Sequence, residues 1–140
     1  MNEQKEITIS TDKNKLNIKL IHKFLTNSYW AEGRTIDQVK ISIENSLCWA
    51  MYLNDEQIGF ARVLTDGAVV AYLMDVFITE KDRGKGYSKM LLNEIFDHKD
   101  LQSVDKWVLA TKDAQDLYKR FGFKAIENPE RLMGRKNKTL

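Results

Sequence analysis

The chain has 140 residues, with 22 Lys and Arg against 20 Asp and Glu, which gives a net charge of +2 at pH 7. Its hydrophobic share of 43% and charged share of 30% are typical of a globular protein, and a single domain over residues 1–140 is expected. The small net charge argues against a nucleic-acid partner, and no apolar run approaches the roughly 20 residues that cross a bilayer, so no membrane partner is expected.

The N-terminal part of the chain is expected to form a strand followed by two helices. The strand is predicted at residues 7–9, and the first helix carries an apolar stripe of Leu16, Leu20, Ile21, Phe24 and Leu25. The second helix begins at a capping box, in which Thr35 is the N-cap and Gln38 reaches back to it. The positions of this helix predicted to face inward are Ile36, Val39 and Ile43.

Three strands are expected next, because residues 47–53, 58–64 and 68–78 are rich in β-forming residues. The first two are joined through the polar segment 54–57, which is typical of a hairpin. A helix to about residue 97, a strand at 107–110, a helix over 112–120 and a strand from residue 123 follow, with a last short strand within 129–135. This order predicts an α+β fold of three layers.

The turn between the longest strand and the following helix has the composition of a phosphate-binding loop. It contains Gly84 and Gly86, and the cations around it are Lys81, Arg83, Lys85 and Lys89. Glycines let the backbone approach a ligand closely, and the N–H groups and dipole of a helix N-terminus favour an anion. An ordinary strand-to-helix turn with solvated lysines is the alternative.

Two common phosphate-binding motifs do not fit this turn. A P-loop requires G-x-x-x-x-G-K-[ST], which the chain does not contain. A dinucleotide fingerprint requires a third glycine where Lys89 stands, and Asp105 precedes the next strand instead of following it.

Two sequence blocks resemble the GNAT superfamily of acetyl-CoA-dependent N-acetyltransferases. Residues 83–88, RGKGYS, are similar to the acetyl-CoA loop [QR]-x-x-G-x-[GA] of that family, with Ser88 in place of the last small residue. Residues 114–123, AQDLYKRFGF, are similar to its A-x-x-L-Y-x-x-x-G-F block. The two blocks occur in the family's order with a strand between them, and the resemblance extends from about residue 47 to residue 123.

The resemblance implies a mixed, mostly antiparallel central sheet flanked by helices, with acetyl-CoA as cosubstrate. It implies that the pantetheine arm pairs with the backbone of Val76, Phe77 and Ile78. The pyrophosphate would be held by the N–H groups of Arg83, Gly84, Lys85, Gly86, Tyr87 and Ser88. Thr111 stands where many family members have a cofactor-contacting Asn.

Two side chains are candidates for the catalytic groups. Tyr118 occupies the family's tyrosine position, where a phenol can protonate the departing CoA thiolate; a packing tyrosine is the alternative. Asp75 is the acid in the strand before the loop, and strand alternation puts it on the face of Phe77, opposite Met74. It is either a base that removes the amine proton, directly or through water, or a carboxylate that orders the loop or pairs with a cation.

In this family the acceptor site is commonly built from the loop between the first two helices. The corresponding residues here are the candidates Tyr29, Trp30, Glu32 and Arg34. Two adjacent aromatic residues near an acidic and a basic side chain suggest a binding surface. A lid that folds back on the core is the alternative. Glu32 would favour a cationic amine, and Arg34 would favour a carboxylate.

Cysteine and histidine usage gives little support to other chemistry. Cys48 lies in an apolar run, which favours a position in the core. It is the single cysteine of the sequence, so no internal disulfide can form, and this favours a cytoplasmic location. His22 and His98 complete no metal-ligand spacing, so no metal is expected.

The function predicted is transfer of an acetyl group from acetyl-CoA to a primary amine of a small molecule or peptide, by direct attack in a ternary complex. A catalytically silent acyl-CoA-binding module of the same fold is the alternative, and a nucleic-acid or protein-interaction domain that uses the basic loop and tail is a third reading. A homodimer is possible, because many members of the family dimerise.

Overall fold

The computed structural model describes residues 5–137, which fall into two compact units, one up to Ala110 and one from Thr111 onward. The first unit contains β1 (Ile7–Ser10), α1 (Ile18–Thr26), α2 (Ile36–Glu44), β2 (Leu47–Leu53), β3 (Glu56–Thr65), β4 (Val70–Ile78), α3 (Tyr87–Phe96) and β5 (Lys106–Val108). Short 3-10 turns lie at Lys13–Lys15, Glu80–Asp82 and Lys99–Leu101. No helix among residues 5–137 is both long and apolar enough to cross a membrane.

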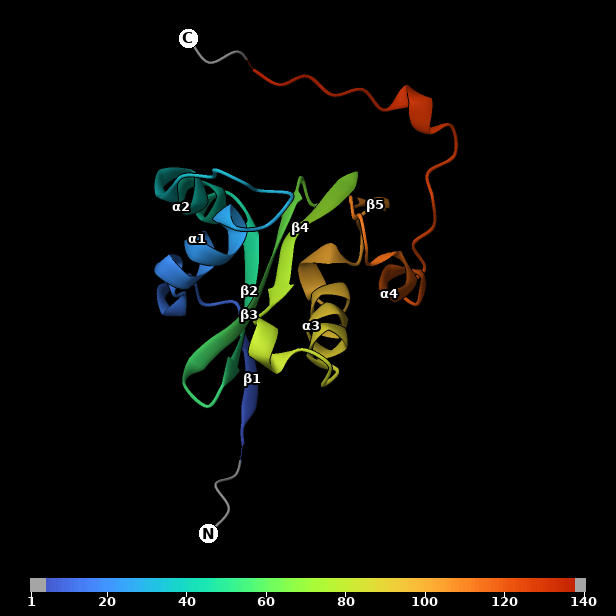
Figure 1. Ribbon diagram of the computed structural model, residues 1–140. Helices are drawn as coiled ribbons and strands as arrows, with labels where there is room; N and C mark the ends of the chain where they lie inside the picture. Colours follow the sequence, from blue (N-terminus) through green and yellow to red (C-terminus); the bar gives the residue numbers. More distant parts are fainter. Residues whose placement is uncertain (1–4, 138–140) are drawn as a thin grey trace. The chain divides into compact units, whose positions relative to one another are not determined.

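The five strands of the first unit form one sheet in sequence order, β1-β2-β3-β4-β5 (Figure 1). The first four pair antiparallel, as successive hairpin-connected strands do, and β5 pairs parallel to β4 after the α3 crossover. The predicted α+β fold with a mixed, mostly antiparallel sheet is therefore confirmed.

The helix N-termini follow the capping signals of the sequence. The Thr35 hydroxyl accepts a hydrogen bond from the Gln38 N–H at 3.1 Å, and the Gln38 side chain accepts one from the Thr35 N–H at 2.9 Å. The predicted inward positions Val39 and Ile43 are buried. Ile36 is 38% exposed, so its inward assignment was wrong; it is the first residue of α2, before the helix packs on the sheet.

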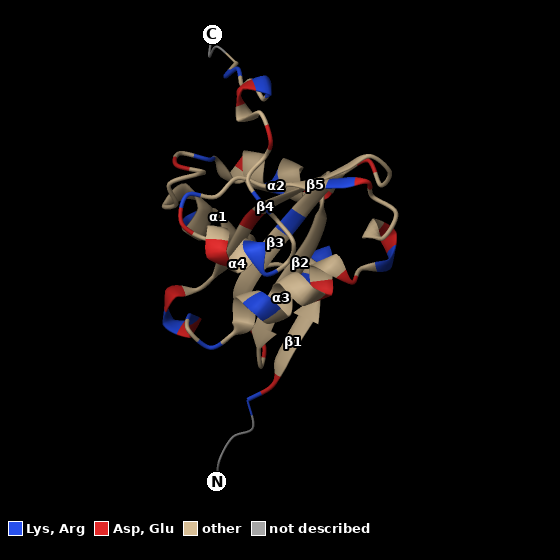
Figure 2. Ribbon diagram, turned by 90° about the vertical axis from the view of Figure 1, so that its right-hand side faces the viewer, with Lys and Arg blue, Asp and Glu red and all other residues tan. Residues whose placement is uncertain are grey.

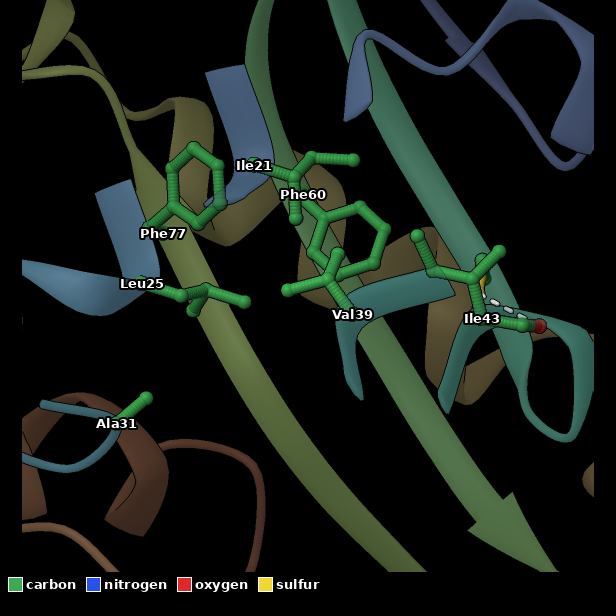
Figure 3. Close-up of a cluster of buried hydrophobic side chains, with 8 residues drawn as sticks. Ile21, Leu25, Ala31, Val39, Ile43, Phe60 and Phe77 are labelled. Carbon is green, nitrogen blue, oxygen red and sulfur yellow. Dashed lines mark hydrogen bonds between the residues drawn. The ribbon is translucent and has the colours of Figure 1, made fainter. Parts of the chain in front are cut away.

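Helices cover both faces of the sheet, which gives the three layers. On one face, Ile21 and Leu25 of α1 and Val39 and Ile43 of α2 pack around Phe60 and Phe77 of the sheet (Figure 3). On the other face, the buried side of α3 consists of Leu91, Leu92 and Ile95. Cys48, as predicted, is a buried member of the first cluster.

An extra residue in β4 breaks the strand's alternation beside Asp75. Phe60 of β3 pairs with Phe77, but Arg62 pairs with Met74, so one residue of β3 lies opposite two residues of β4, Asp75 and Val76. Asp75 has a φ of +56°, a left-handed conformation that accommodates the bulge. Because cross-strand partners share a face, Met74 lies on the Phe60 and Phe77 face, and its predicted position on the opposite face was wrong.

The second unit contains α4 (Gln115–Lys119) and a 3-10 turn at Pro129–Arg131. Neither C-terminal strand expected from the sequence is present among the described residues up to 137. The Phe123 N–H donates to the Tyr118 carbonyl at 3.2 Å, closing the end of α4 instead of joining a ladder. Asn128, with a φ of +55°, then turns the chain into the Pro129 turn.

Candidate functional site

The loop between β4 and α3 has the backbone geometry of an anion site. Gly84 and Gly86 have φ values of +77° and +80°, and Gly86 is the N-cap of α3. The first helical hydrogen bond of α3 runs from the Met90 N–H to the Gly86 carbonyl at 3.2 Å. The N–H groups of the first turn have no partner within a helix, so they are suited to an external acceptor.

The motif position of Arg83 implies that its N–H binds phosphate, but in the structure Arg83 makes hydrogen bonds within the protein. Its N–H donates to the Glu80 carbonyl at 3.3 Å within the 3-10 turn, so this donor is already used. Its side-chain Nε donates to the Ile78 carbonyl at 3.1 Å, and the guanidinium lies 5.8 Å from the centre of the Phe24 ring. Arg83 therefore ties the loop to the end of β4, and the N–H donors suited to a phosphate are those from Gly84 onward.

Two lysines of the loop are engaged with carboxylates. Lys81 donates to Glu56 at 2.8 Å, and this hydrogen bond and the charge of Glu56 raise the pKa of Lys81. Lys85 lies 3.9 Å from Asp82, a buried residue that also accepts a 2.6 Å hydrogen bond from the Thr79 hydroxyl.

The β5 side of β4 offers backbone groups next to this loop. The β4–β5 ladder joins Val70–Tyr72 to Lys106–Val108, and among the described residues it extends no further along β4. Phe77 and Ile78 pair with β3 on their other side. The segment Val76–Ile78 therefore lies beyond the end of the ladder with β5.

A buried ionic cluster lies under the loop between α1 and α2. Asp75 Oδ2 accepts hydrogen bonds from Arg34 Nη1 and Arg62 Nε, each at 2.6 Å, and Asp75 Oδ1 accepts one from Trp30 Nε1 at 3.0 Å. The strands are otherwise largely uncharged (Figure 2), and the Asp75 side chain is only 1% exposed. Of the two interpretations of Asp75, these contacts favour the carboxylate paired with a cation.

Sequence reasoning did not identify Arg62, which completes this cluster. Its side chain is 8% exposed and donates through Nη1 to the Ser46 hydroxyl at 3.1 Å, and that hydroxyl donates to the Ser42 carbonyl at 2.6 Å. A charged residue inside the apolar run 58–64 was the available signal, since arginine is rarely buried without a partner.

The predicted acceptor residues divide into an inward group and an outward group. Arg34 points inward to Asp75, and the Trp30 indole N–H does the same although its residue is 40% exposed. Tyr29, 51% exposed, lies edge-on to Trp30 with ring centres 5.2 Å apart, and Glu32 is exposed.

In the second unit, Tyr118 lies on α4 and is 8% exposed. Its ring packs edge-on against Phe123, with centres 5.9 Å apart. The Thr111 hydroxyl accepts a hydrogen bond from the Ala114 N–H at 3.1 Å, just before α4. Within residues 5–137, no three His, Cys, Asp or Glu side chains form a group that would hold a metal ion.

Comparison with known proteins agrees with this arrangement. Residues 44–125, which include parts of both units, match the family model of the acetyltransferase (GNAT) domain. The chain is 28% identical over 138 residues to an uncharacterized N-acetyltransferase, ycf52, of Pyropia yezoensis, covering 94% of this chain and 77% of that protein.

Two solved structures extend the comparison to the fold. A protein of Xanthomonas campestris pv. campestris assigned to the GNAT acetyltransferases superimposes with a TM-score of 0.90 at 41% identity, covering 94% of each chain. An aminoglycoside N-acetyltransferase in complex with CoA shares the fold, with a TM-score of 0.71 at 15% identity over 99% of each chain. The predicted acyltransferase class is confirmed, and the chain belongs to the GNAT family of acetyltransferases.

Proposed function

We propose that this protein transfers the acetyl group of acetyl-CoA to a primary amine of a small molecule or peptide, by direct attack in a ternary complex. The observation that carries the proposal is the loop at Gly84 and Gly86, whose left-handed glycines precede the N-terminus of α3. Left-handed glycines at a helix N-terminus are typical of loops whose N–H groups bind a phosphate, which supports a pyrophosphate site here.

The donor would bind along β4 and into this loop. The pantetheine arm pairs with the backbone of Val76, Phe77 and Ile78, on the side of β4 that β5 leaves uncovered. The pyrophosphate accepts hydrogen bonds from the N–H groups of Gly84, Lys85, Gly86, Tyr87 and Ser88. Thr111 is assigned to the cofactor by its motif position, and its hydroxyl is also a cap of the segment before α4.

The reaction forms a C–N bond and breaks a C–S bond at the thioester carbonyl carbon. The amine must lose a proton to attack, since an ordinary alkylamine with a pKa of about 10 is mostly charged at neutral pH. The departing thiolate gains a proton, which we assign to the Tyr118 hydroxyl on the strength of the A-x-x-L-Y motif.

Removal of the amine proton is assigned to water instead of Asp75. Both oxygens of the Asp75 carboxylate already accept hydrogen bonds, two from guanidinium groups and one from an indole. The Asp75 side chain is also only 1% exposed, whereas a general base must come within hydrogen-bond reach of the proton that it takes. An unchanged pH–rate profile in the Asp75→Asn variant would support the water route, whereas loss of the acidic limb would support Asp75 as the base.

The proposed function is tested first by calorimetric titration with acetyl-CoA and with acetyl-pantetheine, which lacks the pyrophosphate. Binding that needs the pyrophosphate, followed by acetylation of amines in a screen, is the expected result. Binding without turnover on any amine would favour the acyl-CoA-binding module, and absence of acetyl-CoA binding would overturn both.

The location and assembly of the protein remain predictions. A cytoplasmic site of action agrees with a single cysteine that is free and buried, because no disulfide stabilises the fold. A homodimer is tested directly by the mass of the purified protein in solution.

A further inference from the structure

The loop between α1 and α2 turns its positive charge inward and its negative charge outward. The Arg34 guanidinium is bound to Asp75, and the Arg34 side chain is 19% exposed. Glu32, two residues earlier, is exposed. The guanidinium that would recognise an anionic acceptor is therefore already engaged by a carboxylate of the protein, although Arg62 shares that carboxylate and the three groups together keep a net charge of +1.

The outward side of the loop also presents two aromatic rings. Tyr29 and Trp30 are 51% and 40% exposed, and they meet edge-to-face at 5.2 Å. Large exposed aromatic side chains in the same loop as an exposed carboxylate, Glu32, are suited to an organic cation, because the ring faces carry negative potential. The ring centre of Trp30 also lies 6.3 Å from that of Phe24. The Phe24 ring in turn stacks on the Phe77 ring of β4, with ring centres 4.0 Å apart.

Asp75 holds this loop in place. It receives Trp30 and Arg34 from the loop, and Arg62 holds the same carboxylate from β3. The backbone at Asp75 is left-handed, a conformation that residues other than glycine adopt infrequently, and the contacts of its carboxylate help to maintain it. Because Asp75 immediately precedes Val76–Ile78, the loop is anchored next to the strand assigned to the acetyl-CoA arm.

We propose that the Tyr29–Trp30–Glu32 surface selects an acceptor that carries a second positive charge, such as a diamine, polyamine or lysine-containing peptide, and that Asp75 is the positioning residue for this surface. The proposal rests on the proposed function, since it takes this loop as the acceptor site. One amine attacks the thioester as a neutral group, while the other remains an ammonium ion held by the rings and the Glu32 carboxylate.

A matched pair of acceptors tests the selection directly. Cadaverine and pentylamine have the same carbon chain and differ by one terminal amine. The kcat/KM for cadaverine should exceed that for pentylamine by about 10-fold or more. In Glu32→Gln this ratio should fall toward one, while Glu44→Gln, which changes an exposed carboxylate on α2, should leave it unaltered. Equal use of the two amines by the unmodified protein would overturn the proposal.

The role of Asp75 has its own readout. Asp75→Asn should release Arg34 toward the loop surface. The KM for cadaverine should then rise by a larger factor than the factor by which kcat changes. The dissociation constant of acetyl-CoA should stay within about 2-fold of its value in the unmodified protein. The Trp30 indole N–H signal in an NMR spectrum, identified with Trp30→Phe, should shift in Asp75→Asn and not in Glu44→Gln. An unmoved indole signal or an unchanged cadaverine KM would exclude the positioning role.

Binding separates this inference from the proposed function. Cadaverine should shift the Trp30 indole signal at concentrations where pentylamine does not, whether or not turnover occurs. If cadaverine binds in this way but no amine is acetylated, the selection stands and the transferase proposal fails. If cadaverine has no greater effect than pentylamine, the selection fails whatever the fate of the transferase proposal.

Discussion

The Arg83 side chain donates a hydrogen bond to the Ile78 carbonyl across 3.1 Å, joining the glycine loop to the end of β4. This contact connects the two parts of the proposed donor site, because Ile78 ends the strand and Arg83 begins the loop. The cation of the motif thus acts on the loop's shape, in addition to any effect of its charge on a phosphate.

Arg83 variants distinguish shape from charge. Arg83→Lys keeps the charge but loses the planar guanidinium that reaches the Ile78 carbonyl, whereas Arg83→Gln loses both. If the tie to Ile78 dominates, both variants should weaken acetyl-CoA binding by a similar factor, about 10- to 100-fold for a charge-assisted hydrogen bond. Calorimetry measures the constants, and full affinity in Arg83→Lys would show that charge alone is responsible.

Gly86→Ala should destabilise the loop or reduce its affinity for acetyl-CoA. The φ of Gly86 is +80°, and nothing lies within 4 Å of an added Cβ, so the penalty is conformational and not steric. A Cβ in the left-handed region costs about 1–2 kcal/mol, which would appear as reduced stability or as a displaced loop with reduced acetyl-CoA affinity. Gly134→Ala is the matched control, since its site is open and its φ is not positive. Equal behaviour of the two variants would contradict the prediction.

Tyr118→Phe isolates one hydroxyl. The ring packing on Phe123 is retained, and kcat should fall by roughly 10- to 1000-fold with acetyl-CoA affinity nearly constant. Tyr52→Phe is the control: the Tyr52 hydroxyl donates to the Lys15 carbonyl at 2.9 Å, and its loss should cost about 1 kcal/mol of stability without lowering kcat. A fully active Tyr118→Phe enzyme would remove the general-acid role.

Gly59→Ala should destabilise the sheet by overpacking. A Cβ at Gly59 would lie 2.8 Å from Ile78 Cδ1 and 3.2 Å from the Phe77 carbonyl oxygen. Such crowding typically costs about 1–3 kcal/mol, measured as a lower urea midpoint. Adding Ile78→Val removes the clashing methyl group, so the double variant should lose less than the sum of the two single changes. Simple additivity of the two losses would show that the methyl contact is not the cause.

Cys48 gives the fold a pH dependence above pH 9. Burial raises the pKa of its thiol from 9.0 to about 11, so the unfolded chain ionises first as the pH rises. Stability from this group is complete below pH 9 and is lost between pH 9 and about 11, by roughly 2 kcal/mol. Other groups titrate there too, so the test is the difference in unfolding free energy between the wild type and Cys48→Ala. A difference that does not change with pH would refute the prediction.

The sequence by itself determined the features that depend on near neighbours in the chain. The Thr35–Gln38 capping box, the hairpin after Leu53 and the glycines before α3 were all predicted, because caps and turns are fixed by residues a few positions apart. The two motif blocks indicated the family for the same reason, since each is a short segment with a fixed spacing.

Only the tertiary structure decided which side chains meet. The bulge at Asp75 arises from register across two strands, so alternation along β4 placed Met74 on the wrong face, and it could not show that Asp75 meets Arg34 and Arg62. The strand predicted from Phe123 is a second example. The residues there favour a strand, but a strand forms only when it pairs with another strand. In the structure the Phe123 N–H is instead bonded to the Tyr118 carbonyl. Long-range pairing therefore fixed the charge distribution of the candidate acceptor loop, which composition left open.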